Sequence, residues 1–302
     1  VYILIIITII TTFENFVNSN KRVIIIVIFF CFDLDFVISK ENFQYSIIHN
    51  SRNILKTITE DFNYIMTSPL RMSKKDHLHL LMVSGITSGF VFYLDEKIDK
   101  EYVINKNTPL VYTLGNNFAE ISKEYGKSND RVFYLFGGIT TSLYAGSIML
   151  KNKKLLQTTG LVSESFIFSL LISGSTKLIL GRSRPYMNKG SKDFNFFSFS
   201  DNKDFRSMPS VHTSSAFAMI TVIAKQYNYW WVKVPSYGFL TGIVFQRIHD
   251  HEHWVSDVII GGLIGCSVAN ILVEKHNRNK NNSLSLHPFI STNRIGAFIY
   301  LN

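Results

Sequence analysis

The chain has 302 residues, enough to bury one substantial core or two small ones, and 46% of them are hydrophobic. Its 31 Lys and Arg against 22 Asp and Glu give a net charge of +9, which suits nucleic acid, anionic lipid or phosphate partners. The basic residues lie mostly in short loops between apolar runs, and both cysteines lie inside such runs, so a nucleic-acid partner, a disulfide framework and a zinc site are disfavoured.

Residues 1–39 carry two apolar patches, at 1–12 and 23–32. The second patch follows a basic pair and precedes acidic residues. A basic region before an apolar core of this length is typical of a signal peptide or a short membrane anchor, although no small-residue cleavage site follows. We therefore expect a signal-like or anchor segment at 1–39.

Residues 40–76 are polar and mixed, but their apolar residues recur at helical spacing. These residues are Ile54, Ile58, Phe62 and Ile65. The spacing predicts an amphipathic helix in a segment next to the membrane. A surface helix packed on the protein core is favoured over one bound to lipid.

Six apolar runs then define a predicted domain at 77–275. They cover 80–94, 132–150, 155–176, 211–224, 234–246 and 254–273. The second, third and last runs are long enough to cross a bilayer, and tryptophans flank several runs as they do at membrane interfaces. We expect an all-α, six-helix bundle embedded in a membrane. The shorter runs and a mean hydropathy of only +0.13 leave a soluble all-α domain as the alternative.

Basic residues in the loops predict a multi-pass orientation. They precede the first run, join the second to the third and the fourth to the fifth, and follow the sixth. With six spans, these clusters all fall on one side, which the positive-inside rule makes cytoplasmic. The loops at 95–131, 177–210 and 247–253 then share the non-cytoplasmic face. A cleaved signal within 1–39 would conflict with this orientation.

The tail at 276–302 is polar and then alternates weakly between apolar and polar residues around Gly296. Such alternation is compatible with a short β-hairpin, so the tail is expected to form a segment separate from the helical domain.

The stretch RIHDHEHWVSD at 247–257 directly precedes an apolar, glycine-rich run. We expect it to form the opening turn of a long buried helix, where residues four apart share one face. His253 and Asp257 then stack, and the carboxylate can hold one ring nitrogen and leave the other free as a nucleophile or base. The alternative is a helix cap with a surface ion pair.

Two further stretches carry polar residues at helix ends. KLILGRSRP places Lys177 and Arg184 seven residues apart, near one face of a helix that Pro185 stops. MPSVHTSSAFA begins a helix at Ser210, with His212 in its first turn. Each residue alone also has a plain structural explanation, because lysine and arginine anchor helices at membrane surfaces and serine caps helices.

Together the three stretches supply the groups that bind a phosphoryl anion. The predicted topology places them on one face, where three cations, a hydroxyl, two helix N-termini and two histidines meet. These donors suit a tetrahedral dianion, and phosphoryl transfer also needs a nucleophile and an acid for the leaving oxygen. No Asp or Glu cluster suited to magnesium accompanies them, so the cations would take the place of a metal.

The motifs K-x6-RP (177–185), PS-x-H (209–212) and R-x5-H-x3-D (247–257) resemble the three signature motifs of the type 2 phosphatidic acid phosphatase (PAP2) superfamily. Their order and internal spacing match, and the pattern of apolar runs extends the resemblance to roughly residues 70–275. The resemblance implies a membrane-embedded helix bundle of the PAP2 and haloperoxidase type that needs no metal or other cofactor.

The resemblance also implies a role for each motif residue. His253 is the nucleophile that forms a phosphohistidine, Asp257 orients it, and His212 protonates the leaving alkoxide and then activates water. The phosphoryl oxygens are bound by Lys177, Arg184, Ser210, the backbone N–H of Val211, and Arg247.

Two positions depart from the family pattern, which usually has Gly at Val211 and Ser at Gln246. Val211 keeps its backbone N–H, but its branched side chain is costly if the backbone needs positive φ, and it can crowd the phosphate. The expected result is lower activity or a changed substrate range. His249 and His251 are not motif positions and are expected to face solvent.

The sequence thus predicts a phosphatase that hydrolyses lipid phosphomonoesters or pyrophosphates, with membrane lipids as further partners. A loop at 186–206 interleaves Lys and Arg with five Phe, which suits entry of a lipid phosphate or packing of the aromatics over the helices. Three alternatives stay open: a vanadate-dependent haloperoxidase, a weakly active membrane protein impaired at Val211, and a soluble acid phosphatase of the same superfamily.

Overall fold

The computed structural model describes residues 56–104, 109–121, 129–197, 202–281, 284–291 and 294–301. The expected signal-like segment at 1–39 lies outside these residues. The described part of 56–281 consists of helices and the loops that join them, which confirms the expected all-α class.

The described residues begin with a helix at 56–66 and a 3-10 turn, η1 (Ser68–Arg71). The next helical stretch comprises α4 (Lys74–Gly89), the π-helical turn η2 (Phe90–Leu94), α5 (Asp95–Ile98) and a second π-helical turn, η3 (Asp99–Ile104). The remaining helices are α6 (Pro109–Ile121), α8 (Asn129–Met149), α9 (Lys153–Leu180), α10 (Val211–Gln226), α11 (Trp230–His249) and α12 (Val255–Asn281). The six expected runs all form helices, but α6 and the helix at 56–66 are additional, so the expected count of six is too low.

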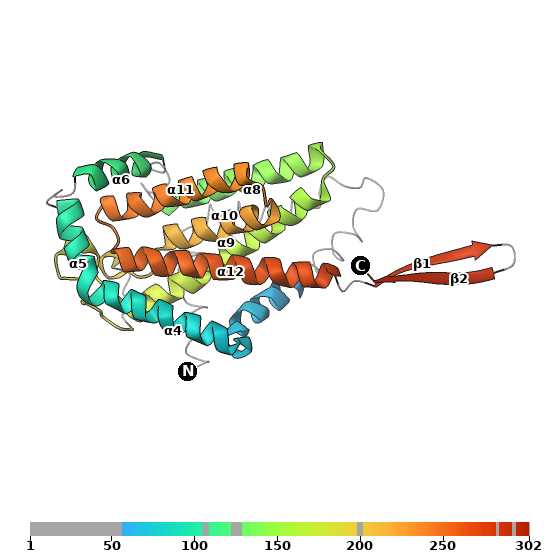
Figure 1. Ribbon diagram of the computed structural model, residues 1–302, viewed down its shortest axis with the longest axis horizontal. Coiled ribbons are helices and arrows are strands. Elements are labelled where there is room, and N and C mark those ends of the chain that lie inside the picture. Colours follow the sequence, from blue (N-terminus) through green and yellow to red (C-terminus); the bar gives the residue numbers. More distant parts are fainter. Residues whose placement is uncertain are drawn as a thin grey trace.

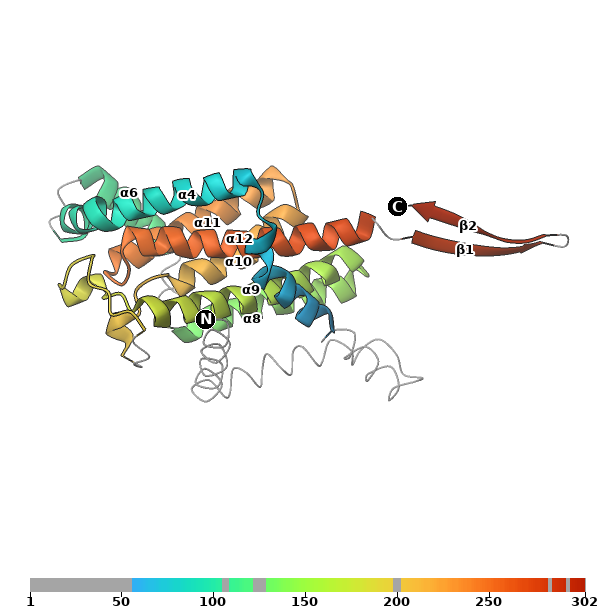
Figure 2. The same ribbon diagram turned by 90° about the horizontal axis from the view of Figure 1, so that it is seen from below.

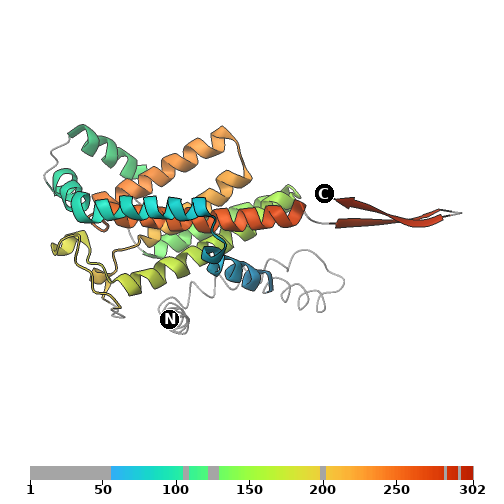
Figure 3. The same cartoon turned by 60° about the horizontal axis from the view of Figure 1, so that its bottom comes forward.

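Helix α10 lies at the centre of the bundle, with α9, α11 and α12 packed around it (Figures 1 and 2). Its buried Met219 belongs to one apolar core together with Phe166 of α9 and Leu272 of α12. Helix α4 runs alongside α12, and α6 lies against α11 (Figure 3). Burial of α10 on several sides explains why its run at 211–224 is apolar although it is short.

Helices α10 and α12 approach closely near their N-termini. A Cβ atom on Gly261 would lie 2.5 Å from the main-chain oxygen of Ser210, and one on Gly265 would lie 2.2 Å from that of Ser214. Only a residue without a side chain allows the two helices to pack at this separation. The contact holds the first turn of α10 beside the first turns of α12, and so joins two of the three motifs.

Three helical stretches among the described residues are long and apolar enough to cross a membrane, namely Lys74–Val103, Lys153–Leu180 and Val255–Arg278. The second contains the expected span at 155–176, and the third covers all but the first residue of the expected span at 254–273. The first contains the run at 80–94, whereas the expected span at 132–150 forms α8 and is not among the three. These stretches support association with a membrane.

The helix at 56–66 packs on the core, as its amphipathic spacing predicts. Ile58 and Phe62 contact the main core cluster. The fully buried Asp61 forms ion pairs with Lys275 and, at 2.8 Å, with His276 near the C-terminal end of α12. A buried carboxylate needs such partners, so these ion pairs fix the helix against the bundle.

Two antiparallel strands, β1 (Leu284–Ser291) and β2 (Arg294–Leu301), follow α12 and form a hairpin in which Leu284 pairs with Leu301. The structure therefore contains the hairpin that the weak alternation in the tail permits. The hairpin extends beyond the C-terminal end of α12, away from the loops that carry the three motifs (Figures 1 and 2).

Helix α9 ends at Gly181, which adopts a left-handed conformation with φ of 56° and donates its N–H to the oxygen of Lys177 at 3.0 Å. A Cβ atom at this position would lie only 1.9 Å from the main-chain oxygen of Asn195. Glycine is therefore required both by the backbone conformation and by the available space. The prediction that Pro185 stops the helix is wrong, because Gly181 ends it first.

Gly181→Ala is expected to destabilise the protein by about 2 kcal/mol or more, because it adds left-handed strain and a backbone clash. The melting temperature in detergent should fall by about 5 °C. Gly160→Ala is the matched control, since a Cβ there meets nothing within 4 Å inside the same helix. The control should melt at or above the temperature of the parent protein, and equal melting temperatures for the two variants would contradict the prediction.

Candidate active site

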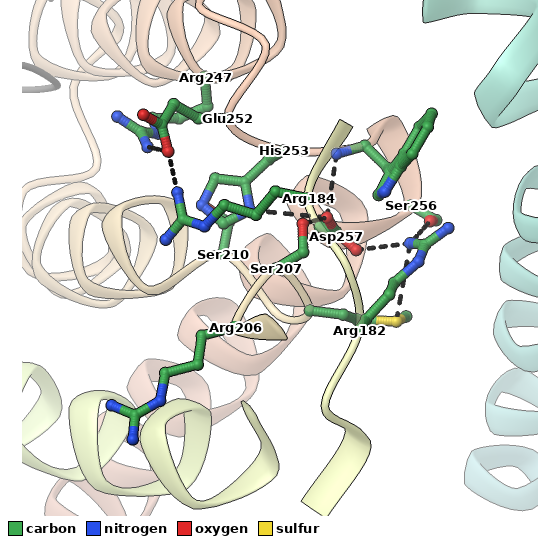
Figure 4. Close-up of polar contacts among 12 residues, drawn as sticks. Arg182, Arg184, Arg206, Ser207, Ser210, Arg247, Glu252, His253, Ser256 and Asp257 are labelled. Carbon is green, nitrogen blue, oxygen red and sulfur yellow. Dashed lines mark hydrogen bonds and ion pairs between the residues drawn. The ribbon is translucent and has the colours of Figure 1, made fainter. Parts of the chain in front are cut away.

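The loop after α9, the start of α10 and the loop between α11 and α12 meet at one end of the bundle (Figures 1 and 4). These segments carry the three motifs. Lys177, Arg184, Arg247 and His212 all lower the pKa of His253 through their positive charge. The five side chains therefore lie near one another. The structure thus brings together residues that are up to 76 positions apart, from Lys177 to His253.

Arg184 lies outside helix α9, so the prediction that it shares a helical face with Lys177 is wrong. Its backbone is extended, with φ of −77° and ψ of 155°. The guanidinium Nε donates to the oxygen of Lys203 at 3.0 Å, which fixes the side chain across the loop. The turn at Gly181, rather than helical periodicity, returns Arg184 toward the site.

Lys177 is buried in the last turn of α9, with 9% of its surface exposed. Its ammonium donates to the main-chain oxygen of Arg206, and to that of Ser207 at 3.2 Å. These bonds hold the chain just before the second motif. Lys177 therefore fixes the loop as well as adding positive charge near His253.

The second motif begins α10 as predicted. Ser210 is fully buried and occupies the N-cap position without making a capping hydrogen bond from its side chain. Its hydroxyl accepts a hydrogen bond from Thr213 Oγ1 at 3.0 Å, and its N–H donates to the main-chain oxygen of Asp257 at 3.0 Å. His212 follows in the first helical turn and is 6% exposed.

Val211 is the first residue of α10, and its φ is not positive. The backbone strain considered for a branched residue at this position is therefore not present. The side chain of Val211 is half-buried at the start of the helix. Its volume, rather than its backbone, is therefore the feature that can crowd a bound phosphate.

His253 lies two residues before α12, so the prediction that it stacks with Asp257 on the helix is wrong. Helix α12 begins at Val255, and His253 belongs to the preceding bend. The two side chains are nevertheless neighbours, with His253 Nδ1 3.6 Å from Asp257 Oδ2. Both are buried, so the alternative of a surface ion pair does not hold either.

Several donors hold the carboxylate of Asp257 in place (Figure 4). Oδ2 accepts the N–H of Trp254 at 2.9 Å and the hydroxyl of Ser207 at 2.5 Å, while Oδ1 pairs with Arg182 at 2.5 Å. The bond from Trp254 is the carboxylate half of a capping box at the start of α12. These contacts orient the carboxylate toward the Nδ1 side of His253.

Arg182 is fully buried and connects this carboxylate to a second one. Its other terminal nitrogen pairs with Asp95 of α5 at 2.8 Å, and Nε donates to the oxygen of Ser191 at 2.9 Å. Asp95 in turn accepts the N–H of Ser256 at 3.0 Å. The guanidinium therefore joins α5, the loop after α9 and the start of α12.

The carboxylate of Glu252 lies between Arg184 and Arg247 (Figure 4). Its Oε2 atom pairs with Arg184 Nη1 and lies 3.5 Å from Arg247 Nη2. The side chain of Glu252 is 35% exposed, whereas those of Arg184 and Arg247 are 14% and 4% exposed. The carboxylate thus lies on the solvent side of the two arginines.

The environment of His253 disfavours its protonated form. Burial lowers the pKa of His253 well below the ordinary value of 6.5, and the positive charges of Lys177, Arg184 and Arg247 lower it further. A neutral imidazole keeps a lone pair on one ring nitrogen near neutral pH. Such a ring can act as a nucleophile or a base.

The other two histidines of the third stretch contact the protein, so the prediction that they face solvent is wrong. His249 Nε2 lies 3.2 Å from the hydroxyl of Tyr112 on α6, and His251 Nε2 lies 2.8 Å from Asp99 on η3. Gln246 is also buried, where it donates to Asp250. These contacts attach the loop between α11 and α12 to the helices around it.

Cations and aromatic rings pair in the described part of the loop at 186–206. The ammonium of Lys189 lies 4.6 Å from the ring centre of Phe205, and that of Lys192 lies 5.8 Å from the ring of Phe92. Phe196 and Phe197 are each more than half exposed. The loop therefore packs some of its aromatic rings and presents others at the surface.

One protein-family model matches the part of the chain that carries the three motifs. Residues 159–281 match the family model of the PAP2 superfamily. The match supports membership of the PAP2 superfamily for this part of the chain. No curated protein and no solved structure shows significant similarity to the chain. The PAP2 region runs from α9 through α12 and contains all three motifs, and its family indicates a hydrolase of the phosphatase kind that acts on phosphate esters.

Sequence reasoning missed several residues that shape the PAP2 site. Arg182 lies inside the first motif stretch, so a third charge between Lys177 and Arg184 was a visible signal. Glu252 is likewise inside the third stretch. Asp95 had no such signal, because it lies 87 positions from Arg182 and outside the PAP2 region.

Asp61, Glu164 and His276 form a group whose ligand atoms, within the described part of the chain, are close enough to hold a metal ion. This group lies near the C-terminal end of α12, about 28 Å along the helix from Asp257. The ammonium of Lys275 already pairs with Asp61 there. The group is therefore separate from the PAP2 site.

Arg182→Met is expected to destabilise the protein by about 3–5 kcal/mol, because it leaves two buried carboxylates without their cation. Thermal unfolding in detergent measures the effect. Arg206→Met is the matched control, since its guanidinium points away from Asp257 in Figure 4. Equal stability losses in the two variants would contradict the importance of the Arg182 network.

His253 is expected to stay neutral at pH 6, because its pKa is lowered in the folded protein. Histidine side-chain NMR of labelled protein measures the titration, and His253→Ala assigns the resonance. Arg184→Met should raise the midpoint, because it removes one of the positive charges near the ring. A midpoint at or above 6.5 in the parent protein would contradict the lowered pKa.

Proposed function

We propose that the protein is a metal-independent phosphatase that hydrolyses lipid phosphomonoesters or pyrophosphates through a phosphohistidine intermediate. The observation that carries this proposal is the buried His253 near an oriented carboxylate and three cations, an environment that lowers the pKa of its ring. A phosphoryl group needs such cations to neutralise its charge, and a neutral imidazole beside them can attack phosphorus. Membership of the PAP2 superfamily supports the same kind of chemistry.

In the proposed first step, the Nε2 atom of His253 attacks phosphorus. Asp257, beside Nδ1, stabilises the positive charge that develops on the ring. The bond from phosphorus to the leaving oxygen breaks, and His212 gives that oxygen a proton. Arg184, Arg247 and Lys177 bind or neutralise the phosphoryl oxygens during this transfer.

In the second step, water replaces the histidine on phosphorus. His212, now neutral, takes a proton from water as the oxygen attacks. The bond between Nε2 of His253 and phosphorus breaks, and inorganic phosphate is released. The imidazole returns to its neutral form, so the cycle closes without a metal or another cofactor.

A lipid substrate is supported by the surroundings of the site. The three apolar helical stretches favour a membrane location, and two of them, Lys153–Leu180 and Val255–Arg278, end or begin next to the motifs. The loop after α9 carries the exposed Phe196 and Phe197 as well as Lys189 and Lys192, and this combination of apolar and cationic side chains suits an amphipathic phosphate. A lipid headgroup at the membrane surface then reaches His253 without leaving the bilayer.

The proposed site faces the non-cytoplasmic side of a multi-pass bundle. The loops that join α8 to α9 and α10 to α11, together with the helix ends that flank them, carry basic residues at the end of the bundle away from the motifs (Figure 1). By the positive-inside rule this end is cytoplasmic. Accessibility labelling of single cysteines placed in the two kinds of loop tests this orientation.

His253→Ala is expected to reduce phosphate release by about a thousandfold or more, because it removes the nucleophile. The assay follows phosphate release from short-chain phosphatidic acid, and then from a polyprenyl pyrophosphate, by detergent-purified protein in EDTA. His251→Ala is the matched control, since it removes a neighbouring histidine that contacts Asp99 instead.

The control should keep most of the activity, and radioactive phosphate should be trapped on the parent protein in an acid-labile form. Full activity in His253→Ala would overturn the proposal. Activity that requires an added metal after EDTA treatment would contradict the metal-independent mechanism.

A further inference from the structure

The carboxylate of Glu252 occupies the position of an anion in the proposed site. One of its oxygens meets both Arg184 and Arg247, two of the residues assigned to the phosphoryl oxygens. Figure 4 shows the three side chains converging beside His253. A carboxylate oxygen and a phosphoryl oxygen accept hydrogen bonds from the same guanidinium groups with similar geometry.

Charge explains why a carboxylate is stable at this position. Both arginines are largely buried, and buried guanidinium groups need a negative partner. Asp257 does not serve them, because its oxygens are engaged by Arg182, Ser207 and Trp254. Glu252 therefore neutralises positive charge that a bound phosphate would otherwise neutralise.

The position of Glu252 allows it to be displaced. Its side chain is the most exposed of the three and lies on the solvent side of the arginines. The backbone around it is held, because His251 contacts Asp99 and the N–H of His253 donates to the oxygen of Arg247 at 3.3 Å. The side chain can thus rotate toward water while the loop and His253 stay in place.

We propose that Glu252 is an internal competitor for the phosphate position and thereby sets the affinity of the site for phosphate. The inference rests on the proposed phosphatase function. A phosphate dianion displaces the carboxylate because it offers more charge and more acceptor oxygens to the same arginines. A singly charged phosphodiester displaces it less well, so Glu252 favours substrates with a terminal phosphate.

The decisive experiment compares Glu252→Gln with the parent protein in detergent. Inorganic phosphate is titrated by calorimetry, and inhibition by phosphate is measured during hydrolysis of a short-chain phosphatidic acid. Glu252→Gln should bind phosphate at least tenfold more tightly, a change of about 1.4 kcal/mol. Its KM should fall by a similar factor with kcat within about threefold, since ground-state competition is removed.

Asp250→Asn is the matched control, because it removes a carboxylate two residues away that contacts Gln246 and His249 rather than the arginines. Its phosphate affinity should stay within about threefold of the parent value. A gain as large as that of Glu252→Gln would show a general charge effect and overturn the inference. Glu252→Ala provides a second test if the glutamine variant does not fold.

Unchanged or weaker phosphate binding in Glu252→Gln, with hydrolysis intact in the parent protein, overturns the inference alone. Glu252 would then orient the arginines rather than compete for them. Absence of both hydrolysis and phosphate binding in the parent protein overturns the proposed function and the inference with it. The two failures are therefore distinguishable in the same set of measurements.

Discussion

The buried guanidinium of Arg182 is the interaction on which the geometry of the site depends. It pairs with Asp257 on one side and with Asp95 on the other, and all three side chains are excluded from solvent. A buried charge is stable only with its partners in place, so the loop after α9, helix α5 and the start of α12 can adopt a single relative arrangement. The glycine contacts between α10 and α12 add the second motif to this assembly.

The same arrangement explains how a histidine becomes a candidate nucleophile. The ring is buried and lies near three cations, so the neutral form is favoured over the charged one. Asp257 lies beside Nδ1 but is itself held by other donors, which leaves it as an orienting group rather than a simple ion-pair partner. The cations proposed to bind a phosphoryl group therefore add to the effect of burial in disfavouring the protonated form of His253.

The two ends of the bundle differ in their charged and aromatic side chains. At one end, the motif loops combine cations with exposed aromatic rings beside the site. At the other, Asp61 is buried against Lys275 and His276 and fixes the helix at 56–66 to α12. Apolar helices connect the ends over a length suited to a bilayer. Under the proposed function, this polarity would put the phosphate site at a membrane surface.

Sequence alone determined the all-α class of the main domain, the positions of the six apolar helices and the three motifs, and it permitted the hairpin in the tail, because periodicity and local spacing depend on neighbouring residues. The sequence predicted that His253 and Arg184 lie on helices, but both lie in loops. Helix α9 ends before Gly181, and a bend that contains His253 precedes α12. Only the tertiary structure decided that Asp95, far along the chain, shares Arg182 with Asp257, and that Glu252 meets two arginines. Such contacts depend on how distant helices pack, and no local pattern records them.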